Sequence, residues 1–154
     1  MSIKLFVMDV DGTLTDGHIY VGNNGEVMKA FNVKDGYAIV KIMPEHGIIP
    51  VIITGKTSEI VKNRAAELRI AEVHQNISDK LPLLKAIAEK YDVTAEEVAY
   101  IGDDVNDLEC MQWCGLSACP ADAVQEVLEQ ADYVCKAQGG RGAVREFIDW
   151  LTKH

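Results

Sequence analysis

Two aspartates near the amino terminus, separated by a single residue, have the types and spacing needed for chemistry. Asp9 and Asp11 directly follow the apolar run Ile3 to Met8, which is typical of a buried parallel strand. Open α/β sheets bind ligands at the carboxyl ends of their strands, and Gly12 lets the backbone turn there. Because two close carboxylates repel each other, the pair predicts a bound cation, and oxygen ligands suit Mg²⁺.

Further polar residues stand near the ends of later predicted strands. They are Thr54, Lys80, Asp103, Asp104, Asn106 and Asp107. Thr54 ends one apolar run and Asp103 follows another, whereas Lys80 sits at a predicted helix start. Each signal is weak when it is taken singly, since such residues also occur in ordinary turns and caps. Their order along the chain is what makes them informative.

The elements that must position these residues alternate between strand and helix. Strands are expected at about 3–8, 48–54, 72–77, 98–101, 116–118 and 133–135, and helices at about 35–44, 58–68, 79–91, 106–113, 122–130 and 142–151. We expect Asp35 to cap the first helix, and a β-hairpin over about 17–31. The alternation predicts an α/β, Rossmann-like three-layer fold with a parallel sheet, a protruding hairpin and a single domain, 1–154.

Composition argues against several other classes of protein. The net charge of −9 lacks the basic face that nucleic-acid binders need. No apolar stretch reaches the roughly 18 residues of a membrane span, and the first residues do not resemble a signal peptide. The four cysteines lack paired zinc-ligand spacing, so we expect mostly buried, reduced thiols in a cytoplasmic protein.

Taken in order, the polar residues resemble those of the haloacid dehalogenase-like (HAD) phosphatases and phosphotransferases. The resemblance runs from Asp9 to about Arg145. It implies that Asp9 attacks phosphorus to form an aspartyl phosphate, and that Asp11 protonates the leaving alkoxide and then activates water. It also implies an Mg²⁺ cofactor held by Asp9, by the backbone carbonyl of Asp11 and by Asp103.

The same resemblance assigns supporting roles to the other polar residues. Thr54 is expected to donate hydrogen bonds to phosphate oxygens, and Lys80 to supply a positive charge. Asp104 and Asn106 are expected near the metal or the substrate. Asp107 is expected to orient the metal ligands or Lys80.

The chain leaves no room for a separate cap domain over the site. Either a large phosphoprotein is the substrate, or neighbouring subunits supply the walls. Residues 16–20, 22–26, 29–37 and 139–146 resemble a capless branch of the family. That branch acts on 2-keto-3-deoxy sugar acid phosphates. It includes 3-deoxy-D-manno-octulosonate 8-phosphate (KDO 8-phosphate) phosphatases, 9-phosphate phosphatases for KDN or N-acetylneuraminate, and domains of CMP-sugar-acid synthetases. It implies a homotetramer joined through the hairpins, with sites at subunit interfaces.

The branch also implies a set of substrate contacts. They are Asn32, Val33, Lys34, Asp35, Gly36, Lys56, Arg64, Lys80, Asn106 and Arg141. Lys56 follows Thr54 closely and is placed to meet the sugar carboxylate, and Arg64 on the next helix could reach the same mouth. Arg141 lies in a glycine-rich run that could act as a flap over its own site or a neighbouring one.

Two competing interpretations belong to other classes of protein. Receiver domains also combine acidic pairs with Thr and Lys, but they need an acceptor aspartate at the end of a later central strand, where this chain has Thr54. A regulatory module that binds a nucleotidyltransferase stays open. Replacement of Asp9 by Asn is expected to abolish turnover in an enzyme and to leave a scaffold unaffected.

Overall fold

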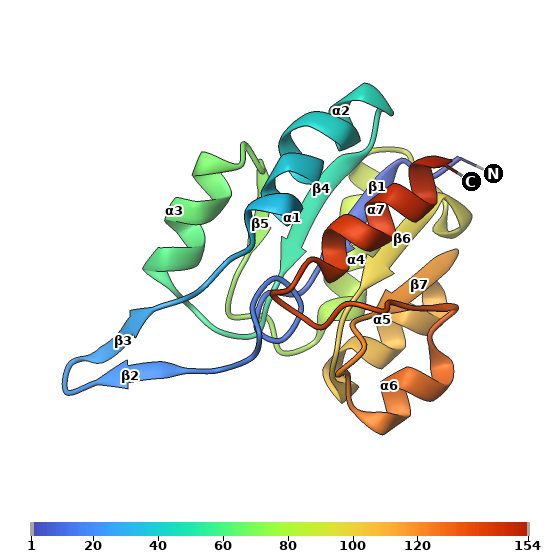
Figure 1. Ribbon diagram of the computed structural model, residues 1–154. Helices are drawn as coiled ribbons and strands as arrows, with labels where there is room; N and C mark the ends of the chain where they lie inside the picture. The colour runs from blue at the N-terminus through green and yellow to red at the C-terminus, as the bar shows by residue number, and fades with distance from the viewer. Residues whose placement is uncertain (1, 154) are drawn as a thin grey trace.

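A computed structural model describes residues 2–153 and contains a six-stranded parallel sheet (Figure 1). Its strands are β1 (Leu5–Met8), β4 (Ile49–Ile53), β5 (Glu72–His74), β6 (Val98–Ile101), β7 (Leu116–Cys119) and β8 (Tyr133–Val134). The strand order is β5-β4-β1-β6-β7-β8, and β1 pairs in parallel with both β4 and β6. The carboxyl ends of these three strands therefore lie side by side at one edge of the sheet.

Helices cover both faces of the sheet, as the alternating sequence pattern predicts (Figure 1). They are α1 (Val33–Tyr37), η1 (Ala38–Ile42), α2 (Met43–Glu45), α3 (Glu59–Glu67), α4 (Lys80–Lys90), η2 (Ala95–Glu97), η3 (Val105–Asp107), α5 (Leu108–Trp113), α6 (Gln125–Gln130) and α7 (Ala143–Lys153). Among residues 2–153, no helix is both long and apolar enough to cross a membrane.

The alternation of side chains along β1 divides the core into two parts. Phe6 and Met8 pack with residues of η1, α3 and α7, whereas Leu5 and Val7 pack with residues of α4, α5 and α6. All four side chains are completely buried. This confirms the α/β three-layer fold. The four cysteines are free thiols, and three of them are buried.

The first helix begins earlier than the sequence suggests, so the prediction that Asp35 caps it is wrong. The side chain of Asn32 accepts the Lys34 backbone N–H at 2.8 Å and caps α1. Asp35 is buried inside the helix and accepts the backbone N–H of Arg145 at 2.9 Å, in the first turn of α7. After α1 the chain continues as the π-helical turn η1, which ends two residues before Pro44, a residue with no N–H to donate.

The predicted hairpin is a separate two-stranded sheet that protrudes from the body of the molecule (Figure 1). It consists of β2 (Tyr20–Gly22) and β3 (Gly25–Met28). Three apolar side chains on it, Val21, Val27 and Met28, are more than half exposed, and so is Ile19 just before β2. No cap domain is built between β1 and α1 or between β4 and α4.

Candidate active site

The carboxyl ends of β1, β4 and β6 border a cavity of about 300 Å³. Its lining consists of Asp9, Asp11, Gly17, Ile19, Thr54, Gly55, Lys56, Asp103, Asp104 and Asn106. Seven of these residues were predicted from the sequence to take part in catalysis or binding. The fold therefore gathers side chains from three distant segments of the chain into one site. A larger cavity of about 610 Å³ includes Ile3, Ile48 and Leu116, and it lies away from these aspartates.

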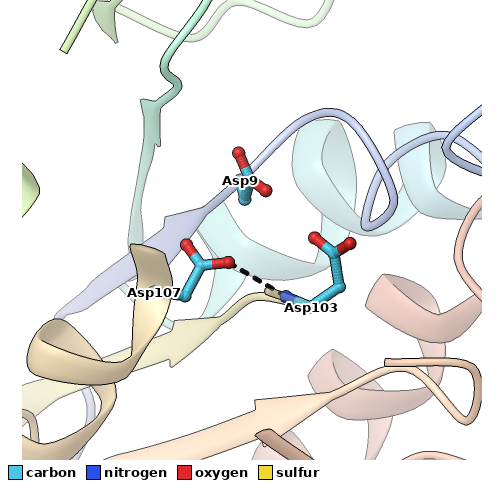
Figure 2. A group of neighbouring side chains, drawn as sticks. All are labelled: Asp9, Asp103 and Asp107. Atoms are coloured by element: carbon cyan, nitrogen blue, oxygen red, sulfur yellow. Dashed lines mark hydrogen bonds between the residues drawn. The ribbon is translucent and has the colours of Figure 1, made fainter. Parts of the chain in front are cut away.

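Three aspartates face one another at this edge of the sheet (Figure 2). Asp9, Asp103 and Asp107 each offer a carboxylate oxygen, and these oxygens all lie within 4.8 Å of one another. Burial raises the pKa of Asp9, the Asp107 carboxylate raises it further, and Lys80 opposes the shift. Burial and the Asp9 carboxylate likewise raise the pKa of Asp103. A divalent cation would relieve this repulsion, and all-oxygen ligands fit Mg²⁺.

Asp107 serves a different purpose from the other two aspartates, because both of its oxygens are already hydrogen-bonded. Oδ1 accepts from Lys80 Nζ at 2.9 Å and from the Tyr100 hydroxyl. Oδ2 accepts the backbone N–H groups of Asp103 and Asp104, at 3.0 and 3.2 Å. The fully buried Asp107 thus fixes the loop that carries Asp103.

Lys80 does not line the cavity but contacts Asp9, which does. It is the first residue of α4, is 2% exposed, and places Nζ 3.2 Å from Oδ1 of Asp9 and 2.9 Å from Oδ1 of Asp107. Burial lowers the pKa of Lys80, but the two carboxylates outweigh burial and raise it. The side chain therefore keeps a positive charge beside Asp9 at neutral pH.

The loop after β1 approaches Asp103 so closely that one position requires glycine. Gly12 has a φ of +92°, and a Cβ atom there would lie 2.0 Å from Oδ2 of Asp103. The hydroxyl of the buried Thr13 donates to Oδ1 of Asp103 at 3.0 Å. On the other side of the loop, a Cβ at Gly139 would lie 2.0 Å from the Gly12 carbonyl oxygen. The predicted glycine-rich flap is thus packed against the Asp9 loop.

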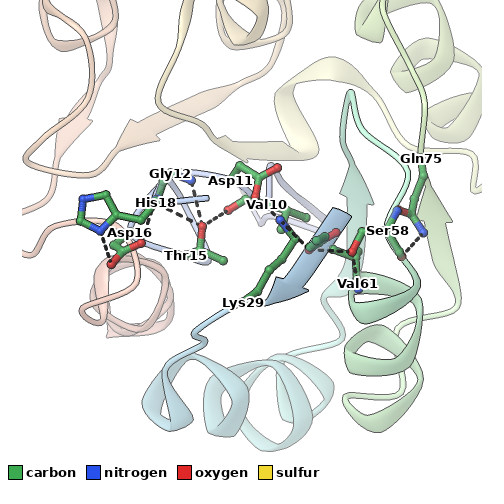
Figure 3. A network of polar contacts seen from close by, with 12 residues as sticks. Val10, Asp11, Gly12, Thr15, Asp16, His18, Lys29, Ser58, Val61 and Gln75 are labelled. Carbon is green, nitrogen blue, oxygen red and sulfur yellow. Dashed lines mark hydrogen bonds and ion pairs between the residues drawn. The ribbon is translucent and has the colours of Figure 1, made fainter. Parts of the chain in front are cut away.

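Three residues of this site were not foreseen from the sequence, namely Thr13, Lys29 and Tyr100. Lys29 comes from the hairpin and donates from Nζ to Oδ1 of Asp11 at 2.6 Å (Figure 3). Nothing in its local sequence indicates this contact. Tyr100 does carry a signal, because a lone hydroxyl in an otherwise apolar strand needs a hydrogen-bonding partner.

Comparison with known proteins places the chain in a family. Residues 52–148 match the family model of the haloacid dehalogenase-like hydrolases. The chain is also 47% identical, over 150 residues, to 3-deoxy-D-manno-octulosonate 8-phosphate phosphatase KdsC of Escherichia coli K12, covering 97% of this chain and 79% of the relative. It belongs to the haloacid dehalogenase-like hydrolases.

Solved structures of this hydrolase family have the same fold. The 3-deoxy-D-manno-octulosonate 8-phosphate phosphatase of Yersinia pestis superposes with a TM-score of 0.93 at 44% identity, over 97% of this chain and 80% of that one. The corresponding phosphatase of Moraxella catarrhalis superposes with a TM-score of 0.94 at 39% identity, over 98% and 86%. The Moraxella structure contains a magnesium ion, a phosphate ion and a KDO molecule.

Some substrate contacts predicted by resemblance to this hydrolase family lie outside the cavity of this single chain. They are Asn32, Val33, Lys34, Asp35, Gly36, Arg64 and Arg141. Asp35 is buried against α7, as described above. The Arg64 guanidinium lies 5.4 Å from the centre of the Phe31 ring and pairs with Glu67 at 2.5 Å. Val33 and Arg141 are exposed, so both are available to a neighbouring molecule.

Proposed function

We propose that this chain is an Mg²⁺-dependent phosphatase that hydrolyses KDO 8-phosphate through an aspartyl phosphate on Asp9. The observation that carries the proposal is the position of Asp9. It stands at the end of the central strand, lines the cavity, contacts the ammonium of Lys80, and lies within 4.8 Å of Asp103. The curated relatives at 45–47% identity are named for the eight-carbon substrate, which favours it over nine-carbon alternatives.

The residues of the cavity supply each step of such a hydrolysis. An oxygen of Asp9 forms a bond to phosphorus while the bond from phosphorus to the sugar oxygen breaks. Asp11 gives its proton to that sugar oxygen as the alcohol departs. A water molecule then transfers a proton to Asp11 and attacks the phosphorus, which returns Asp9 as a carboxylate. Thr54 donates hydrogen bonds to the phosphoryl oxygens, whose charge increases during transfer.

Mg²⁺ would be held by Asp9, by the backbone carbonyl of Asp11 and by Asp103. When bound, the ion neutralises part of the charge that otherwise prevents one anion from attacking another. Lys80 adds a fixed positive charge beside Asp9. Asp107 holds Lys80 and the Asp103 loop in place through three hydrogen bonds, and Tyr100 donates a fourth to it.

The sugar would be bound partly by this chain and partly by its neighbours. Lys56 lines the cavity and suits the sugar carboxylate. Val33 and Arg141 are exposed and do not reach this cavity, which fits an assembly in which one subunit completes the site of another. We therefore propose a homotetramer joined through the hairpins, whose exposed apolar side chains would be buried in the contact.

The test compares three phosphate esters under one set of conditions with Mg²⁺. They are KDO 8-phosphate, a sialic-acid-type 9-phosphate and 4-nitrophenyl phosphate. We expect kcat/KM to favour KDO 8-phosphate by about a hundredfold, or about 2.7 kcal/mol of transition-state binding. The Asp9→Asn variant serves as the control and should show no turnover. A preference for the 9-phosphate would contradict KDO 8-phosphate as the substrate. Unchanged turnover by Asp9→Asn would contradict the aspartyl-phosphate mechanism.

A further inference from the structure

Lys29 contacts the side chain to which the proposed function assigns proton transfer. Its Nζ lies 2.6 Å from Oδ1 of Asp11 (Figure 3). The Lys29 side chain is only 8% exposed, although all four residues of β3 just before it are exposed. Lys29 does not line the cavity, so it would affect the substrate indirectly, through Asp11.

A second set of contacts holds Lys29 in place. Oε1 of Glu26 accepts from Lys29 Nζ at 3.2 Å and from the Ser58 hydroxyl at 3.1 Å. Ser58 caps α3 by accepting the Val61 backbone N–H, and its own N–H donates to Oε1 of Gln75 at 2.6 Å. A continuous series of polar contacts thus runs from the start of α3, through the hairpin, to the carboxylate of Asp11.

We propose that Lys29 is a positioning residue for Asp11, an inference that rests on the proposed phosphatase function. The ammonium holds Oδ1 of Asp11, so that Oδ2 is the oxygen presented to the leaving group. The Asp11 side chain is 24% exposed and lies in a loop, where an unrestrained carboxylate would sample several rotamers. A charge-assisted contact of this length restricts that motion. It also makes the geometry of Asp11 depend on how the hairpin is seated.

If Lys29 only anchored the hairpin, its replacement would affect activity differently. Two phosphate esters that differ in their leaving group distinguish this role from the positioning of Asp11. The value of kcat/KM reports the steps up to the departure of the alcohol. The alkoxide of KDO is a poor leaving group that must receive a proton from Asp11, whereas 4-nitrophenolate departs without one. Misplacement of Asp11 therefore lowers kcat/KM for the sugar phosphate selectively. Misplacement of the whole hairpin would lower kcat/KM for both esters alike.

The experiment measures kcat/KM of the full-length protein with Mg²⁺ for both esters, in the wild type and in Lys29→Met. We expect about a thirtyfold loss of kcat/KM on KDO 8-phosphate, which is less than the roughly hundredfold or more that general acid catalysis contributes because Asp11 is misplaced and not removed, and less than about a threefold loss on 4-nitrophenyl phosphate. The matched control is Lys62→Met, which removes a lysine that is 72% exposed and pairs only loosely, at 3.8 Å, with Glu59. It should change neither value.

A second variant makes the test independent of how well Lys29→Met folds. Glu26→Gln keeps the Lys29 charge and weakens the contact that anchors it, so we expect the same selective loss at a smaller size. Equal losses on both esters, or no loss on either, would overturn the positioning role. A wild-type protein that hydrolyses neither ester would instead reject the phosphatase assignment on which the inference rests.

Discussion

Replacement of Gly12 by alanine tests how closely the loop after β1 must approach the proposed metal ligand Asp103. A Cβ at Gly12 would lie 2.0 Å from Oδ2 and 2.6 Å from Cγ of Asp103. Neither distance is tolerable, so the Asp103 carboxylate or the loop must move. In addition, the φ of +92° lies in a region that an L-alanine rarely adopts.

Gly25 provides a control that separates these two effects. Its φ is +104°, but a Cβ there would have no atom within 4 Å. The backbone cost of an L-residue in the left-handed region, about 1–2 kcal/mol, applies to both positions. Overpacking adds about 1–3 kcal/mol at Gly12 alone. We therefore expect Gly12→Ala to lower the free energy of unfolding by about 2–5 kcal/mol, and Gly25→Ala by about 1–2 kcal/mol.

Urea unfolding at equal protein concentration measures these stabilities, and an Mg²⁺ titration of the phosphatase rate reports on Asp103. We expect Gly12→Ala to lose about a hundredfold in kcat/KM, since a shift of about 1 Å at a reacting centre has that effect. It should also need more Mg²⁺ for half-maximal rate, whereas Gly25→Ala should respond to Mg²⁺ as the wild type does. Equal stability losses in the two variants, together with an unchanged Mg²⁺ requirement, would refute the argument.

Three further predictions concern buried polar contacts. Tyr100→Phe removes a hydroxyl that donates to Asp107. The free energy of unfolding measured in urea should therefore fall by about 1–2 kcal/mol. Lys80→Met leaves the buried carboxylates of Asp9 and Asp107 without their cation. We expect the free energy of unfolding measured in urea to fall by about 3–5 kcal/mol, and kcat to fall at least a hundredfold. Hydrogen bonds, of which the one from Lys90 contributes most, lower the pKa of Glu72 from 4.5 to about 2. The stability from this depressed pKa is complete above about pH 4.5 and disappears toward pH 2, so the destabilisation caused by Glu72→Gln should shrink over that range in acid-unfolding curves.

Much of the fold followed from patterns that are local in the sequence. Apolar runs and alternating helices predicted all six strands of the sheet, and the glycine-rich turn at 22–25 predicted the hairpin. The start of the first helix was wrong by a few residues because Asn32 and Asp35 are both good capping residues. Only the packing of α7 shows that Asp35 has another partner.

The sequence by itself determined that Asp9, Thr54 and Asp103 lie at one edge of the sheet, because each follows a parallel strand and such strands end at a common edge. The order β4-β1-β6, which makes the three strands neighbours, came from the structure. The family resemblance then supplied their proposed roles.

Only the tertiary structure decided how these residues are held. Asp107 is saturated by four donors, two of them from Lys80 and Tyr100, which lie far from each other in the sequence. Lys29, which directly follows β3, reaches Asp11 in the loop after β1 although the two lie 18 positions apart in the chain. Such contacts depend on side-chain distances between separate elements, and neither strand alternation nor helix periodicity encodes those distances.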